Sequence, residues 1–163
     1  MEYLLLTSAK NPRIKQVCSL RERKERDKEG VTILEGYREL SRAHLLGIRI
    51  RECYFCPELF LGENEYSLLE DLQKSGAEVF QTTEAILTKL AYRDRPEGLI
   101  AVAEMRKKGL ESIPLKENGL YLVAETIEKP GNLGSILRSA DAVNATGVII
   151  CNRQTDIFNP NVI

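Results

Sequence analysis

The chain has 163 residues, of which 43% are hydrophobic and 29% charged, a composition that excludes a disordered chain and fits an ordinary globular protein. No run approaches the roughly 18 apolar residues of a membrane span. The acidic start with three leucines is unlike a signal peptide, so we expect a cytoplasmic location. The net charge of −1 gives no general attraction for nucleic acid, so any such attraction must be local.

The first two thirds of the chain alternate between helical and extended patterns. Asn11-Pro12 predicts a helix start, because an N-cap residue is followed by proline, and Gly30 predicts that helix's end. Further on we expect strands at 31–34, 48–56, 77–80 and 98–103, and helices at 36–46, 65–75 and 83–91. Strands that alternate with helices indicate a layered α/β domain.

Residues 106–119 are charged, broken by proline and glycine, and lack periodicity, so we expect an interdomain linker. A strand at 120–124, a helix carrying Leu137 and Ala140 on its apolar face, and a strand at 148–150 then predict one βαβ unit. Because 44 residues bury too little surface to be stable alone, the unit must pack on the first domain, pair with a second copy, or begin a larger domain. We favour the last, a truncated domain.

The turn of this βαβ unit carries the most informative residues. Pro130 and Gly131 turn the chain after the strand, Asn132 is suited to cap the new helix, and Gly134 permits close approach of a backbone or ligand. The N–H groups and positive dipole of a helix start favour an anion, such as RNA phosphate. The spacing lacks the G-x-G-x-x-G of dinucleotide-binding sites. Gly131-x-x-Gly134 resembles the G-x-x-G loop of KH-type RNA-binding domains, but here it follows a strand, which does not fit that class.

From Pro130 to Ala140 the sequence Pro-Gly-Asn-Leu-Gly-Ser-Ile-Leu-Arg-Ser-Ala resembles the first signature motif of the SpoU (TrmH-like) class of knotted SPOUT methyltransferases. Two positions depart from the usual pattern: Lys129 replaces an Asp, and Asn144 replaces a Gly but also tolerates a positive φ. The later Asp156-Ile-Phe-Asn159-Pro160 resembles the Asp-x-x-Asn-Pro step of the same family.

The front half is similar to the same family's substrate-binding domain at Asn11–Lys15, Arg23–Arg26 and Leu34–Arg38. The resemblance implies an α/β fold class, with an L30e-like RNA-binding domain at 1–105, the linker, and a truncated α/β-knot (SPOUT) domain at 120–163. It also implies a homodimer when the protein is complete.

The activity that the resemblance implies is transfer of a methyl group from S-adenosylmethionine to a ribose 2′-OH of structured RNA, either rRNA or tRNA. The resemblance implies that the matching arginine, Arg138, contacts RNA phosphate and helps to activate the hydroxyl, and that Asn132 helps to order the site. Two further family motifs, which hold S-adenosylmethionine, would follow Ile163. We therefore expect residues 1–163 to be inactive alone.

Each of these residues also has a plainer interpretation. Arg138 by itself would be an ordinary surface residue, Ser135 and Ser139 fit packing or capping roles better than nucleophilic ones, and Asn132 is expected to cap the helix in any case. Glu125, at the end of the strand, is a possible second polar group of the site.

From Lys10 to Lys28 there are eight basic and three acidic residues, a local net charge of +5. Such a helix is either solvated, with intrahelical pairs such as Glu22–Arg26, or in contact with phosphates. The family resemblance favours RNA, and the candidate RNA-binding residues are Arg13, Lys15, Arg23, Lys24, Arg26 and Arg38.

Metal binding is not expected. Cys53 and Cys56 lie in a strand pattern without a second ligand pair, and His44 is the only histidine. We expect the four cysteines to be free thiols, mostly buried.

Two other functions stay open: a non-enzymatic L30e-like RNA-binding module, and an assembly protein that uses the βαβ unit as an oligomer contact. The reading frame beyond Ile163 would discriminate between them and the enzyme.

Overall fold

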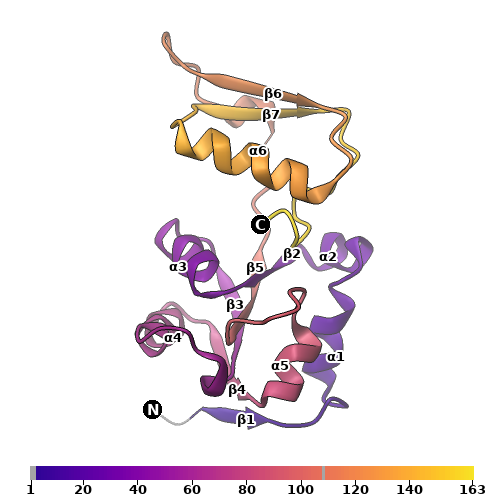
Figure 1. The fold of residues 1–163 in the computed structure, drawn as a ribbon, viewed down its shortest axis with the longest axis vertical. Helices are drawn as coiled ribbons and strands as arrows, with labels where there is room; N and C mark the ends of the chain where they lie inside the picture. Colours follow the sequence, from indigo (N-terminus) through magenta and orange to yellow (C-terminus); the bar gives the residue numbers. More distant parts are fainter. Residues whose placement is uncertain (1–2, 108) are drawn as a thin grey trace. The chain divides into compact units, whose positions relative to one another are not determined.

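The computed structural model describes residues 3–107 and 109–163 (Figure 1). The chain divides into two compact units, Met1–Met105 and Arg106–Ile163. Both contain strands and helices, so the predicted α/β class is confirmed. Within the described part of the chain, no helix is long and apolar enough to cross a membrane.

The first unit is built on a five-stranded sheet of order β1-β4-β3-β5-β2. Strands β1, β4 and β3 are parallel, whereas β5 runs antiparallel to both β3 and β2. The strands are β1 (Leu4–Leu6), β2 (Val31–Glu35), β3 (Ile50–Phe55), β4 (Glu78–Thr82) and β5 (Leu99–Glu104). The helices are α1 (Pro12–Ser19), α2 (Arg23–Glu29), α3 (Tyr37–Leu45), the 3₁₀ turn η1 (Pro57–Leu59), α4 (Glu65–Lys74) and α5 (Glu84–Leu90).

Helices cover both faces of this sheet (Figure 1). On one face, Ile14 of α1 and Leu87 of α5 belong to a core cluster with strand residues such as Tyr54. On the other face, Leu40 of α3 and Leu69 of α4 form the second cluster. Strand β3 contributes to both cores, because its successive residues Tyr54 and Phe55 face opposite sides of the sheet.

Cys53 and Cys56 are fully buried and are free thiols, as expected. Burial raises the pKa of Cys53 to about 12. Burial, together with a hydrogen bond from the Cys56 thiol to the Glu58 carboxylate, raises the pKa of Cys56 to about 11. Both thiols are therefore protonated at neutral pH and are poor nucleophiles and metal ligands.

The predicted single helix from Asn11 to Gly30 is wrong, because it breaks between Ser19 and Arg23. Leu20 is buried at the break. The guanidinium of Arg26, only 2% exposed, donates to the Leu20 and Arg21 carbonyls at 2.8 and 2.7 Å. Arg26 thus satisfies carbonyls that the end of α1 leaves free. The proposal of Arg26 as an RNA contact is wrong for the same reason.

Gly36 separates β2 from α3, with a φ of 99°. This φ favours glycine, because residues with a Cβ rarely adopt it. The preceding Glu35 is buried, and its carboxylate accepts hydrogen bonds from the N–H groups of Tyr92 and Arg93. This part of the Leu34–Arg38 motif therefore attaches the loop after α5 to the end of β2.

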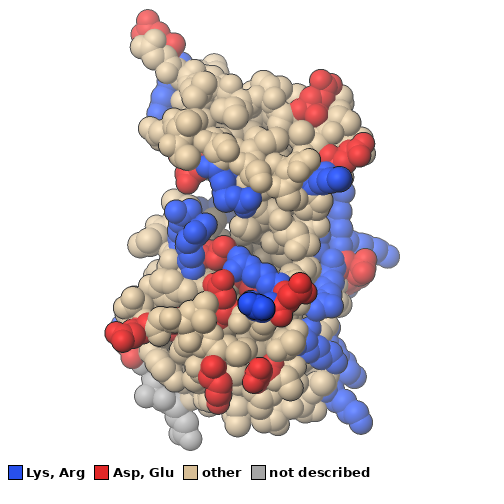
Figure 2. Space-filling model, viewed as in Figure 1, with Lys and Arg blue, Asp and Glu red and all other residues tan. Residues whose placement is uncertain are grey.

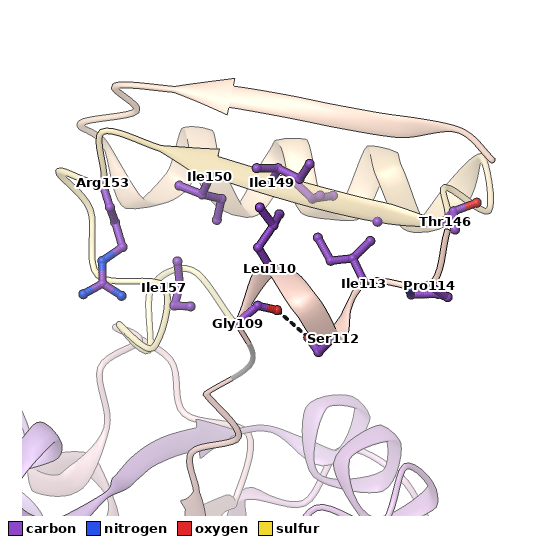
Figure 3. A pocket seen from close by; sticks show the side chains of 12 residues that line it. Gly109, Leu110, Ser112, Ile113, Pro114, Thr146, Ile149, Ile150, Arg153 and Ile157 are labelled. Atoms are coloured by element: carbon purple, nitrogen blue, oxygen red, sulfur yellow. Dashed lines mark hydrogen bonds between the residues drawn. The ribbon is translucent and has the colours of Figure 1, made fainter. Parts of the chain in front are cut away.

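The second unit contains the predicted βαβ arrangement, in which β6 (Tyr121–Glu125) and β7 (Gly147–Cys151) are parallel and joined by α6 (Pro130–Ala142). The 3₁₀ turn η2 (Leu110–Ser112) lies on the face of this sheet opposite α6 (Figure 3). Leu110 and Ile113 point toward β7 there and line a cavity of about 450 Å³. The Tyr121 hydroxyl donates to the Pro114 carbonyl at 2.7 Å, so part of the expected linker is held against the strands.

Replacing Arg26 with alanine should destabilise the protein by about 2–3 kcal/mol, because the variant loses two buried hydrogen bonds from a charged group. Urea denaturation of the 163-residue chain measures this loss. Lys28→Ala on the same helix is the matched control. Its amine makes exposed pairs with Glu25 and Glu29, worth less than about 0.5 kcal/mol. Equal losses in the two variants would contradict the capping role of Arg26.

Candidate functional site

The polar groups of the second unit gather at the carboxyl ends of β6 and β7. Parallel strands bring these two ends to one edge, where the Asn152 side-chain amide donates to the Glu125 carboxylate at 2.8 Å. The next residue after β6, Thr126, has a φ of 53°, which is rare for a β-branched side chain. Backbone strain of this kind collects at binding and catalytic sites, so this edge is a candidate site.

Helix α6 starts at this edge, three residues earlier than a cap at Asn132 requires. Pro130 occupies its first turn and Lys129 is the N-cap, without a capping side chain. Asn132 is therefore the third helical residue, and its N–H bonds to the Lys129 carbonyl at 3.1 Å. The expectation that Asn132 caps the helix is wrong, because proline is preorganised for the first helical position.

The Asn132 side chain is consequently left free. It is exposed and makes no hydrogen bond with any residue that the structure describes. The amide can therefore donate and accept hydrogen bonds from a ligand at the start of α6.

The last residues of the chain fold back onto the start of α6. The Thr155 hydroxyl lies 2.7 Å from the Ile127 carbonyl and 2.6 Å from the Glu128 carbonyl, and Val162 is buried. A Cβ at Gly134 would lie 2.8 Å from the Val162 carbonyl oxygen. The prediction that Gly134 permits close approach of a backbone is confirmed.

Arg138 is exposed, and its side chain runs back along α6 toward the helix start. Its Nη2 donates to the Ser135 hydroxyl at 3.2 Å, and the hydroxyl itself donates to the Gly131 carbonyl at 2.9 Å. Among residues 3–107 and 109–163, Arg138 makes no ion pair, so its positive charge is not neutralised. Asn132 lies on the same helix, about 9 Å away along the axis at the usual helical rise.

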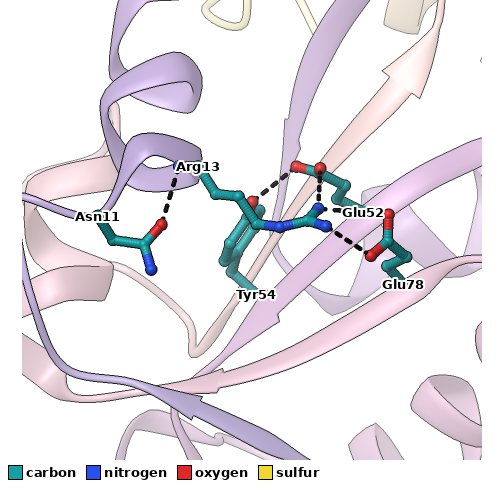
Figure 4. Close-up of polar contacts among 5 residues, drawn as sticks. All are labelled: Asn11, Arg13, Glu52, Tyr54 and Glu78. Carbon is teal, nitrogen blue, oxygen red and sulfur yellow. Dashed lines mark hydrogen bonds and ion pairs between the residues drawn. The ribbon is translucent and has the colours of Figure 1, made fainter.

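In the first unit, Arg13 is held by carboxylates (Figure 4). Its guanidinium pairs with Glu52 at 2.7 Å and Glu78 at 2.8 Å, and it lies 4.8 Å from the Phe80 ring centroid. The Asn11 side chain accepts from the Arg13 N–H at 2.9 Å, so the predicted cap of α1 is confirmed. Arg13 thus fastens α1 to β3 and β4, and its expected contact with RNA phosphate stays a prediction.

Other basic side chains between Lys10 and Lys28 also serve the fold. Arg23 pairs with Asp27 at 3.4 Å, and Arg21 donates to the Lys89 and Ala91 carbonyls at the end of α5. Lys and Arg side chains still gather along the side of the first unit that carries α1 and α2 (Figure 2). The exposed candidates without an ion pair in the described chain are Lys15, Lys24 and Arg38.

The described residues include no group of three His, Cys, Asp or Glu side chains placed to hold a metal ion. Sequence reasoning missed the strained Thr126 and the contact between Ser135 and Arg138. Nothing in the sequence indicates the strain at Thr126. The contact between Ser135 and Arg138 could have been predicted, because residues three apart on a helix are neighbours.

Each of the two units matches a different family of known proteins. Residues 11–101 match the MRM3-like substrate binding domain, and residues 119–163 match the SpoU rRNA Methylase family. The 23S rRNA (uridine(2479)-2′-O)-methyltransferase of Streptomyces viridochromogenes is 30% identical over 96% of this chain and 54% of its own length. RlmP of Bacillus subtilis, a 23S rRNA (guanosine(2553)-2′-O)-methyltransferase, is 25% identical over 94% of this chain and 57% of its own.

Solved structures agree with these matches. An rRNA methyltransferase from Sinorhizobium meliloti superposes with a TM-score of 0.87 at 27% identity, covering 99% of this chain and 60% of that one. An RNA 2′-O ribose methyltransferase is 39% identical, with a TM-score of 0.83 and coverage of 98% and 60%. The chain thus spans little more than half the length of these relatives. With a substrate-binding domain followed by the SpoU motif, this chain belongs to the SpoU family of RNA methyltransferases.

Proposed function

We propose that this chain is part of an enzyme that transfers a methyl group from S-adenosylmethionine to a ribose 2′-OH of ribosomal RNA. The observation that carries the proposal is the unneutralised guanidinium of Arg138 on α6, within the Pro130–Ala140 motif. The names of the relatives, which are 23S rRNA 2′-O-methyltransferases, favour rRNA over tRNA. A homodimer and a cytoplasmic location stay predictions.

The chemistry explains why a free arginine is useful. A ribose hydroxyl is a poor nucleophile, so it must be oriented and relieved of its proton before it attacks a methyl group. A guanidinium binds phosphate through two parallel N–H bonds. Arg138 would hold the phosphate beside the target ribose and stabilise the negative charge that develops on the 2′-oxygen. The unbonded Asn132 amide would orient the same nucleotide.

S-adenosylmethionine supplies an electrophilic methyl group on sulfur, and a structure of the S. meliloti enzyme is described as AdoMet-bound. The cavity of Figure 3 does not fit this cofactor, because its lining residues are mainly apolar and include no carboxylate to bind the ribose hydroxyls. We expect residues that follow Ile163 to bind it, so residues 1–163 alone should not methylate RNA.

Replacing Arg138 with alanine in the intact gene product should lower kcat by at least about 100-fold, because one charged transition-state contact is lost. Transfer of labelled methyl from S-adenosylmethionine to rRNA measures the rate. Lys116→Ala, an exposed charge removed from the same unit, is the control and should retain the wild-type rate. A rate for Arg138→Ala within a few-fold of the wild-type rate would show that Arg138 has no catalytic role.

Replacing Lys15 and Lys24 together should weaken RNA binding for every sequence and flatten the plot of log affinity against log salt. Each lost phosphate contact reduces the slope by about 0.7–0.9. Lys74→Ala is the control, since Lys74 is an exposed lysine on α4 that pairs with Asp71 at 3.3 Å. An unchanged slope in the double variant would show that Lys15 and Lys24 do not contact phosphate and that α1 and α2 form an ordinary solvated surface.

A further inference from the structure

Ser135 links Arg138 to the backbone of α6, and this link suggests a role for the serine. A hydroxyl has one proton to donate and two lone pairs to accept with. The Ser135 proton goes to the Gly131 carbonyl at 2.9 Å, which fixes the oxygen on the helix surface. A lone pair then accepts from the Arg138 Nη2 at 3.2 Å.

Gly134 leaves room for this arrangement. Arg138 Nη1 lies 3.3 Å from the point that a Cβ at Gly134 would occupy, so the guanidinium covers the bare backbone of the preceding turn. Long side chains of a helix lean toward its N-terminus in this way. The guanidinium is thereby held near the start of α6, where the N–H groups of the first turn also attract anions.

The chemical nature of the partner distinguishes Arg138 from arginines that serve the fold. Arg13 and Arg93 are each held by two carboxylates, which fix the side chain but neutralise its charge. A serine hydroxyl restricts the side chain and leaves the full positive charge for a ligand. Binding a phosphate then costs less rotamer entropy, because part of it has been lost before the RNA arrives.

We propose that Ser135 is a positioning residue that orients Arg138 for the methyl-transfer step. The inference rests on the proposed function and adds a residue that touches neither substrate nor cofactor. If it is correct, the loss of the Ser135 hydroxyl should act on the reaction only through Arg138.

The test is a double-mutant cycle in the intact gene product, with kcat and KM measured for methylation of rRNA. Ser135→Ala should lower kcat about 3–10-fold, the effect of one modest hydrogen bond, with less than about a twofold change in KM. Ser135→Thr, which keeps the hydroxyl, should restore the rate. In an Arg138→Ala background, Ser135→Ala should have no further effect. An equal decrease in that background would overturn the proposal.

Ser139→Ala is the matched control, since Ser139 is exposed on α6 beside Arg138 and, in the part of the chain that the structure describes, its hydroxyl makes no hydrogen bond with the guanidinium. A decrease as large as that of Ser135→Ala would indicate a general effect on the helix and would overturn the proposal.

A second measurement does not depend on catalysis. The ¹⁵N heteronuclear NOE of the Arg138 Nε–Hε group in the 163-residue chain should be high in the wild type and lower in Ser135→Ala. The same value in both would also overturn the positioning role. A wild-type enzyme that methylates no RNA would instead refute the proposed function, so the two failures are distinguishable.

Discussion

The start of α6 at Pro130 fixes the positions of Asn132, Ser135 and Arg138 in the candidate site. Proline in the first turn sets the helical register directly after the strained turn at Thr126. That register places Gly134 under the Val162 carbonyl and aligns Ser135 with Arg138. A helix that began at Asn132, as the sequence first suggests, would use the asparagine side chain as a cap and remove it from the site.

Arg13, Arg21, Arg26 and Arg138 differ in what they contact. Arg26 and Arg21 satisfy carbonyls at helix ends, and Arg13 fastens α1 to the sheet. These side chains stabilise the fold, although they lie in a basic segment of the sequence. Arg138 is different, because its partner is a hydroxyl and its charge is uncompensated. Net charge over a segment is therefore a poor guide to phosphate binding unless the contacts of each residue are known.

Much of the fold could be predicted from the sequence, because local patterns determine it. The apolar second half of β3, the periodicity of α4 and α5, and the glycine at the end of α2 each predicted the right element within a few residues. The break at Leu20 could not be predicted, because it depends on Arg26 turning inward to meet carbonyls of the segment between α1 and α2. The short strand β1 was missed as well, since Leu4–Leu6 pairs with β4, which lies more than 70 residues away.

The residues of the site that lie on α6 could be predicted from the sequence, but Thr126, Asn152 and the geometry could not. The order Pro130, Asn132, Gly134 and Arg138 was sufficient to suggest RNA methyl transfer through resemblance to the SpoU class. The roles of Asn132 and Ser135 required coordinates, because they depend on where the helix starts and on which way a long side chain turns. Among the basic residues of the first unit, exposure and ion pairing separate Lys15 and Lys24 from Arg13 and Arg26.

The central claim is that the methyl group goes to a ribose oxygen of RNA. A 2′-O-methyl group protects the adjacent phosphodiester from alkaline cleavage, because the hydroxyl that would attack the phosphorus is blocked. Alkaline hydrolysis of rRNA treated with the intact gene product and S-adenosylmethionine, read at single-nucleotide resolution, tests the claim directly. We predict a protected position that is absent when Arg138 is replaced by alanine. An unprotected backbone, with the methyl group found on a base, would contradict the account.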